Sequence, residues 1–185
     1  MITVVYLHGF RSCPQAKKAS LLRQAWSDKV RFVAPDLNDS PANVKKLLLD
    51  TVKDIDPKSL VLVGASLGGF YAHWLAEQVD CRAILLNPAT QPWNVINQYL
   101  GEQTIYGTDR TITVTPEFAD ELKAMEVEVS DASRYWVLLC TGDEVLDWKV
   151  AHTKYADCHQ IVVEGNNHMI EGFDTWIPDL EKFVL

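Results

Sequence analysis

Residues 60–69 read LVLVGASLGG, an apolar run that ends in a serine at the spacing Gly-x-Ser-x-Gly. The five-residue pattern alone is weak, because glycine and serine are common enough to produce it by chance in about one chain in twenty of this length. Its context is more specific, since the apolar run fits a buried parallel strand and residues 67–79 have the pattern of a following helix. Such a turn projects the Ser66 hydroxyl from the carboxyl edge of a sheet and leaves no room for side chains at Gly64 and Gly68.

A serine hydroxyl is a weak nucleophile at neutral pH, so the pattern requires a base and an orienting acid elsewhere in the chain. His168 lies on a loop that follows a short strand over 161–163, and it is the expected general base. Asp143 follows the apolar run 135–140, and it is the expected orienting acid. The chain order Ser66, Asp143, His168 is the order found in α/β-hydrolases.

A second aspartate in the same acidic loop, Asp147, lies directly before a helical pattern. Aspartate at that position most often caps a helix by accepting a backbone N–H. We therefore expect Asp147 to cap the helix and Asp143 to orient the histidine.

The loop after the first strand, 2–7, reads His8-Gly9-Phe10 and is the expected oxyanion loop. In the oxyanion hole of α/β-hydrolases, one backbone N–H comes from the loop after an early strand and another from the residue after the serine. The expected donors are Phe10 and Leu67, and Gly9 allows the backbone to approach closely. For His8 the favoured interpretation is a hydrogen bond that orders the loop, with a second catalytic role as the alternative; His8 and Gly9 are also placed in the substrate site.

The remaining pattern alternates strands with helices. Strands are expected over 2–7, 31–34, 59–63, 82–86, 135–140 and 159–163, and helices over 13–28, 41–54, 67–79, 147–157 and 171–183. This alternation predicts an α/β protein with a doubly wound, mostly parallel sheet of about six strands and helices on both faces. The site should lie at the carboxyl edge of that sheet.

One segment, 87–134, interrupts the alternation within what we expect to be a single domain, 1–185. It contains two short helical patterns, over 92–100 and 116–125, with an extended piece over 111–114 between them. We expect this insertion to cover the active site partly. Trp93, Tyr99 and Phe70 are candidates for contact with substrate, and packing of the insertion onto the domain is an equally open alternative.

Composition excludes several classes. The chain has 185 residues, 48% of them hydrophobic, and a formal net charge of -8, so a nucleic-acid partner is disfavoured. The densest basic cluster, Lys17-Lys18, reads as a solvated helix face, and no apolar run is long enough for a membrane span. Four cysteines lie far apart without metal-ligand spacing, so we expect reduced thiols, no metal, no cofactor and a cytoplasmic location.

Five segments together resemble the small bacterial YqiA/YcfP-type esterases of the α/β-hydrolase superfamily. They are YLHGF at 6–10 with Ser12 and Pro14, VGASLGGFYA at 63–72, NPA at 87–89, TGDEVLD at 141–147 and EGNNH at 164–168. The resemblance spans nearly the whole chain and implies a short hydrolase of carboxylic esters with Ser66, Asp143 and His168 as its triad. Asn167 departs from it, since such sequences more often show glycine there.

The sequence therefore predicts acyl transfer to water through an acyl-enzyme on Ser66. Two alternatives stay open. An acyl-CoA thioesterase would use the same residues, and it would need Arg11, Lys17 and Lys18 at the entry to offset the net negative charge. A non-catalytic binding module of the same fold would lack turnover and would not react with a fluorophosphonate. Oligomeric state and acyl chain length are not encoded in any pattern we identify.

Overall fold

The computed structural model describes residues 1–185 and contains a six-stranded sheet of order β2-β1-β3-β4-β7-β8. Every neighbouring pair in this sheet is parallel. The strands are β1 (Thr3–Leu7), β2 (Arg31–Val33), β3 (Leu60–Ala65), β4 (Arg82–Leu86), β7 (Tyr135–Cys140) and β8 (His159–Val163). The structure confirms the α/β class and the doubly wound, parallel sheet of six strands predicted from the sequence.

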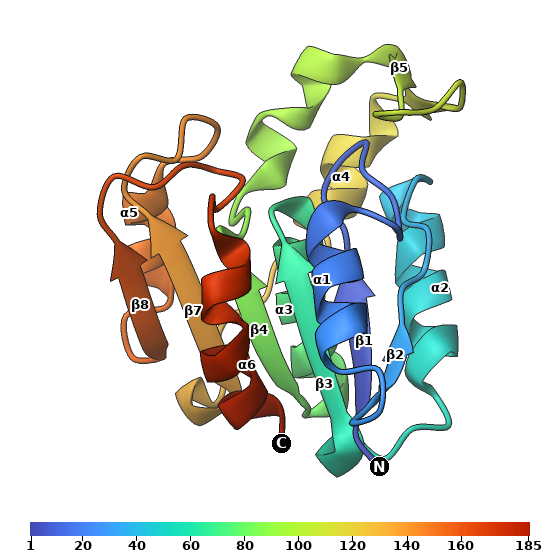
Figure 1. Ribbon diagram of the computed structural model, residues 1–185. Helices are drawn as coiled ribbons and strands as arrows, with labels where there is room; N and C mark the ends of the chain where they lie inside the picture. Colours follow the sequence, from blue (N-terminus) through green and yellow to red (C-terminus); the bar gives the residue numbers. More distant parts are fainter.

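Helices cover both faces of the sheet (Figure 1). On one face lie α1 (Lys17–Ala25) and α6 (Ile177–Val184), and on the other lie α2 (Pro41–Val52), α3 (Leu67–Val79) and α5 (Trp148–Lys154). Alternate residues of each central strand therefore enter different cores, so that Leu62 packs with α2 and α3 while Val63 packs with α1 and α6. Burial on both sides explains why the strands read as continuous apolar runs.

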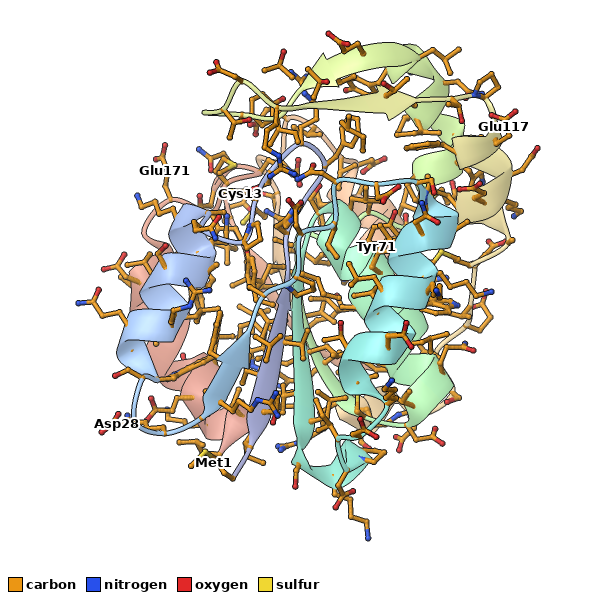
Figure 2. All side chains as sticks on the ribbon, turned by 90° about the vertical axis from the view of Figure 1, so that its right-hand side faces the viewer. Met1, Cys13, Asp28, Tyr71, Glu117 and Glu171 are labelled. Atoms are coloured by element: carbon orange, nitrogen blue, oxygen red, sulfur yellow. The ribbon has the colours of Figure 1, made fainter.

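The loops that carry the candidate residues share one end of the sheet. Figure 2 shows Cys13, Glu117 and Glu171 at the end of the molecule opposite Met1, where the carboxyl ends of the strands lie. Tyr71 lies on the face covered by α2 and belongs to the larger core. The parallel topology thus brings the loops after β1, β3, β7 and β8 to a common edge.

The insertion lies above this edge in Figure 1. It contains η2 (Pro92–Asn94), η3 (Ile96–Tyr99), the antiparallel pair β5 (Gly101–Thr104) and β6 (Thr111–Val114), and α4 (Glu117–Lys123). The extended piece at 111–114 is confirmed as β6, whereas its partner β5 was not predicted. Three of the four β5 residues are exposed, so the strand lacks the apolar alternation that marks a buried one.

Several predicted helix ends were wrong. The helix expected over 171–183 is divided into η5 (Phe173–Trp176) and α6, because Pro178 is tolerated in the first turn of a helix and not in its interior. The helix expected from 13 begins at Lys17, after Ala16 and without a side-chain cap. Two further short turns, η1 (Pro57–Ser59) and η4 (Ala132–Arg134), lead into β3 and β7.

The interpretation of Lys17-Lys18 as a solvated face was wrong for Lys18. Its side chain is buried in the first turn of α1, with Nζ 5.8 Å from the centre of the Phe173 ring. Burial lowers its pKa to about 8.

None of the helices is both long and apolar enough to cross a bilayer.

Candidate active site

The turn between β3 and α3 holds Ser66 in an unusual backbone conformation. Its φ is 55° and its ψ is -120°, a combination that costs a residue other than glycine free energy and persists only where surrounding bonds impose it. Those bonds are present: the Ser66 N–H donates to the Leu86 carbonyl (3.1 Å), and the Ala89 N–H donates to the Ser66 carbonyl (2.9 Å). The strained conformation is therefore fixed by the end of the neighbouring strand β4.

The glycines around Ser66 are sterically required. A Cβ on Gly64 would lie 2.2 Å from the Gly68 carbonyl oxygen, and a Cβ on Gly68 would lie 1.9 Å from the Leu7 carbonyl oxygen. The prediction that the turn has no room for side chains at these two positions is confirmed. A Cβ on Gly9, in contrast, would lie 3.4 Å from the Ser66 Cβ, an ordinary contact that places the loop after β1 directly against the serine.

Gly68→Ala should therefore lower the free energy of unfolding by about 3 kcal/mol or more, because the added methyl group would overlap β1 backbone that cannot move freely. Gly9→Ala is the matched control and should cost less than about 1 kcal/mol, since its methyl group meets no closer contact than 3.4 Å. Urea unfolding of both variants measures the difference. Equal costs would show that the turn is looser than the structure indicates.

Two backbone N–H groups close to the Ser66 turn have no backbone hydrogen-bond partner. The Phe10 N–H makes no backbone hydrogen bond, and Leu67 is the first residue of α3, where helix geometry supplies no partner for the N–H. The loop that carries Phe10 is closed by a hydrogen bond from the Ser12 N–H to the Gly9 carbonyl (3.1 Å). Phe10 and Leu67 are the residues whose N–H groups the sequence motif predicts as oxyanion donors, and that role stays a prediction.

His8 orders the loop after β1, the expected oxyanion loop, through both of its ring nitrogens. Its Nε2 accepts from the Leu37 N–H (2.9 Å), so the ring proton must lie on Nδ1, which donates to the Gly9 carbonyl (2.8 Å). Burial lowers the pKa of His8, and the opposing effects of the Gly9 carbonyl and the Asp36 carboxylate do not restore it. No ring nitrogen of His8 is left free for proton transfer or for substrate.

Acidification should destabilise the protein partly through His8. The unfolded chain takes up a proton near a pKa of about 6.5, whereas the folded protein resists it, so the free energy of unfolding should fall as the pH drops below that value. His73 acts in the same direction, because burial lowers its pKa to about 4.

Unfolding of wild type and His8→Gln between pH 7 and pH 5 measures the His8 contribution. The variant should show a shallower loss of stability, and His159→Gln, which changes an exposed ring, should follow the wild-type curve. A slope unchanged in His8→Gln would contradict the assignment of His8 as a neutral, buried hydrogen-bonding group.

Asp143 and His168 form a hydrogen-bonded pair. Asp143 Oδ2 lies 2.8 Å from His168 Nδ1, and Asp143 Oδ1 accepts from the N–H groups of Val145 (2.9 Å) and Leu146 (2.8 Å). Burial by itself would raise the pKa of Asp143, but the bonds from the His168 ring and from these two N–H groups outweigh it and lower the pKa. The carboxylate is thus ionised and holds the proton of His168 on Nδ1, which leaves Nε2 available to accept another.

The register of β7 and β8 brings this pair together. Cys140 lies opposite Val163, and the next residue, Thr141, donates its N–H to the Val163 carbonyl (3.0 Å). Asp147 lies farther along and caps α5, since its Oδ1 accepts from the Lys149 N–H (3.0 Å). The structure therefore separates the two aspartates as the sequence predicted.

Ser66 shares the sheet edge with this pair but is not hydrogen-bonded to it. No hydrogen bond joins the Ser66 hydroxyl to the His168 ring, whose Nδ1 is bonded to Asp143. In enzymes without bound substrate, hydrogen bonds between catalytic groups are often long or poorly aligned. Asn167, where the resemblance favours glycine, has no positive φ; Gly165 does, at 72°. Asparagine is therefore accommodated at 167 without backbone strain.

Two polar contacts at this site were missed from the sequence. Glu144 Oε2 accepts from the His168 N–H (3.0 Å), and the Asn87 side chain donates to the His168 carbonyl (3.0 Å). Asn87 belonged to a motif of the family resemblance, yet no property of the sequence alone pointed to its contacts. It lies in the same chain turn as Ala89, which fixes Ser66.

The aromatic candidates for substrate contact mainly pack against one another. Phe70 is buried and packs edge to face against Trp93, with 6.0 Å between the two ring centres. Lys123 Nζ lies 4.4 Å from the centre of the Trp93 ring. Phe10 meets Tyr99 edge to face at 5.2 Å. These contacts join the insertion to the domain.

A small cavity of about 10 Å³ lies beside the loop after β1. Its walls include Phe10, Leu67, Tyr71, Ile96 and Phe118, and it has room for about one water molecule. Neither Phe70 nor Trp93 lines it. No group of three or more histidine, cysteine, aspartate or glutamate side chains is arranged to hold a metal ion.

A model of the uncharacterised protein family UPF0227 matches residues 3–185. The chain belongs to UPF0227. Among curated relatives, this UPF0227 protein is similar to the UPF0227 protein YcfP of Salmonella paratyphi A, with 23% identity over 186 residues that cover 97% of each chain. The predicted resemblance to YcfP-type proteins is confirmed.

Solved structures show the same fold. The UPF0227 protein resembles Est1E from Butyrivibrio proteoclasticus with a TM-score of 0.74 and 13% identity, covering 98% of this chain and 86% of that one. It also resembles the alpha/beta hydrolase domain-containing protein 10 from mouse, with a TM-score of 0.71, 18% identity and coverage of 98% and 89%. At these identities the likeness establishes the α/β-hydrolase fold of the UPF0227 protein.

Proposed function

We propose that this UPF0227 protein is a serine hydrolase of carboxylic esters that works through an acyl-enzyme. The observation that carries the proposal is the Asp143–His168 hydrogen bond of 2.8 Å at the sheet edge that also holds Ser66 in its strained turn. An aspartate that fixes a histidine tautomer, at the same sheet edge as a half-buried serine turn, is the arrangement that nucleophilic acyl transfer requires.

In this mechanism His168 Nε2 takes the hydroxyl proton as Ser66 Oγ attacks the ester carbonyl. The negative charge that develops on the carbonyl oxygen is stabilised by the N–H groups of Phe10 and Leu67. His168 then gives the proton to the departing alcohol, and Ser66 is left acylated. Water, activated by the same ring, releases the acid and restores the hydroxyl.

The basic groups favour esters over acyl-CoA thioesters. Of the three cations that an anionic carrier would need, Lys18 is buried against Phe173, and Arg11 donates its Nε to the Thr104 carbonyl (2.7 Å). Only Lys17 is exposed and without such a contact. The entry therefore offers little to offset the charge of coenzyme A, given a net charge of -8.

The proposal is tested by fluorophosphonate labelling together with turnover of p-nitrophenyl esters and acyl-CoAs of graded chain length. We expect one label per chain on Ser66, ester turnover, and a preference for short acyl groups, because the cavity beside Leu67 is small. Faster turnover of acyl-CoAs would replace the ester by a thioester substrate. If the folded protein is not labelled and hydrolyses no ester, the alternative of a non-catalytic binding module would be favoured.

A further inference from the structure

Asn87 directly follows β4, the strand that lies between the nucleophile strand β3 and the acid strand β7. It is buried, with 3% of its surface exposed, and its φ is 41°. Asparagine is among the few residues that adopt this left-handed region readily. A buried amide in this backbone conformation must have its polar atoms satisfied, and the partners it uses are informative.

The side chain of Asn87 uses its acceptor and its donor amide together. Its Oδ1 accepts from the Cys140 N–H (2.8 Å), while its Nδ2 donates to the carbonyls of Asn167 (3.2 Å) and His168 (3.0 Å). Its own N–H donates to the Leu138 carbonyl (2.9 Å). One side chain thus joins the end of β7 to the loop that presents His168.

The Asn87 side chain connects the end of β4 to the His168 loop, a connection that strand pairing in the sheet does not make. β8, which leads into the His168 loop, is an edge strand that pairs with β7 alone. The nucleophile lies on the other side of β7, and its N–H is bonded to Leu86, the residue before Asn87. Consecutive residues of one turn therefore hold the backbone of Ser66 and the backbone of His168.

We infer that Asn87 is a positioning residue that sets the distance between His168 and Ser66 by holding the carbonyls of residues 167 and 168. The inference rests on the proposed hydrolase function for its kinetic consequence, although the placement of the His168 ring can be measured without turnover. Asn87 acts through the backbone of the histidine loop and touches no reacting atom. Only an amide of this length carries an acceptor for Cys140 and donors for two carbonyls at once.

The test compares Asn87→Asp and Asn87→Gly with Arg82→Met. Asn87→Asp keeps an acceptor for Cys140 and places a second oxygen against two carbonyls, and Asn87→Gly removes the side chain while accepting a φ of 41°. Arg82 is a matched control because it lies at the other end of β4 and also donates to two consecutive carbonyls, those of Phe183 (2.5 Å) and Val184 (3.2 Å).

In the Asn87 variants we expect kcat to fall about 10- to 100-fold with KM nearly unchanged, since small displacements of a catalytic group have effects of this size. The low-field NMR signal of the His168 Nδ1 proton, hydrogen-bonded to Asp143, should shift or broaden in the same variants. Arg82→Met should lower the unfolding temperature and leave both kcat and the NMR signal as in wild type.

Wild-type kcat and an unchanged His168 signal in a folded Asn87 variant would overturn the inference. An equal loss of kcat in Arg82→Met would overturn it as well, because it would show a general effect of stability. If Asn87→Asp does not fold, Asn87→Gly gives the decision. A wild-type protein that hydrolyses no ester would refute the proposed function alone, and the NMR signal would still decide whether Asn87 positions His168.

Discussion

Replacing Ser66 with alanine should lower kcat/KM for ester hydrolysis by at least ~10⁴-fold and abolish fluorophosphonate labelling. The hydroxyl is the only group in the proposed mechanism that forms a bond to the substrate, and no neighbouring side chain can take its place. The fold should persist, because the Ser66 hydroxyl makes no hydrogen bond in the structure and the turn is held by backbone bonds to Leu86 and Ala89. Initial rates, labelling and urea unfolding measure the three effects.

Ser20→Ala is the matched control for this substitution. Its hydroxyl donates to the Gln15 carbonyl (3.0 Å) at the surface, away from the candidate triad. This variant should keep wild-type rates and labelling. Substantial turnover by Ser66→Ala would move the chemistry to another residue.

Asp143→Asn should lower kcat by up to ~10⁴-fold with little change in stability. Asp143 Oδ1 accepts from the N–H groups of Val145 and Leu146, so the carbonyl oxygen of asparagine would occupy that position. The new NH₂ group would then face His168 Nδ1 and force the ring proton onto Nε2. In that tautomer His168 cannot accept the serine proton, and only the residual stabilisation by the oxyanion donors remains.

Asp147→Ala separates this effect from a general effect of the acidic loop. Because Asp147 caps α5, its loss should cost about 1 kcal/mol of stability with a modest change in kcat. Rate measurements and denaturant unfolding of the two variants make the comparison. A stable, inactive Asp147→Ala beside an active Asp143→Asn would assign the triad's acid to Asp147.

The parts of the fold that the sequence predicted well are those encoded locally. The helix α3 was predicted with its observed bounds, 67–79, because the glycines fix its start at the serine turn. The sheet followed from buried apolar runs, and Asp143 and His168 met because parallel strands end at one edge. The position of a residue in a loop directly after a parallel strand can thus be predicted once the strand itself has been recognised.

The parts that the sequence did not predict depend on contacts between distant segments. β5 is polar and exposed, so its pairing with β6 leaves no periodic signal. Lys18 packs against Phe173, which lies far along the chain, and the sequence around Lys18 gives no sign of that contact. Asn87 escaped notice for the same reason, because its partners lie on β7 and beyond β8.

The order of the strands along the chain also determines when the site can form as the protein is made. The loop after β1 and the serine turn after β3 are held by residues up to Ala89, whereas Asp143 and His168 follow β7 and β8, the last two strands along the chain. A chain that leaves the ribosome N-terminus first can therefore build the nucleophile turn well before it holds a base. Under the proposed function, a chain that ends before His168 cannot cleave esters, so ester cleavage begins only after β8 and the His168 loop have been synthesised.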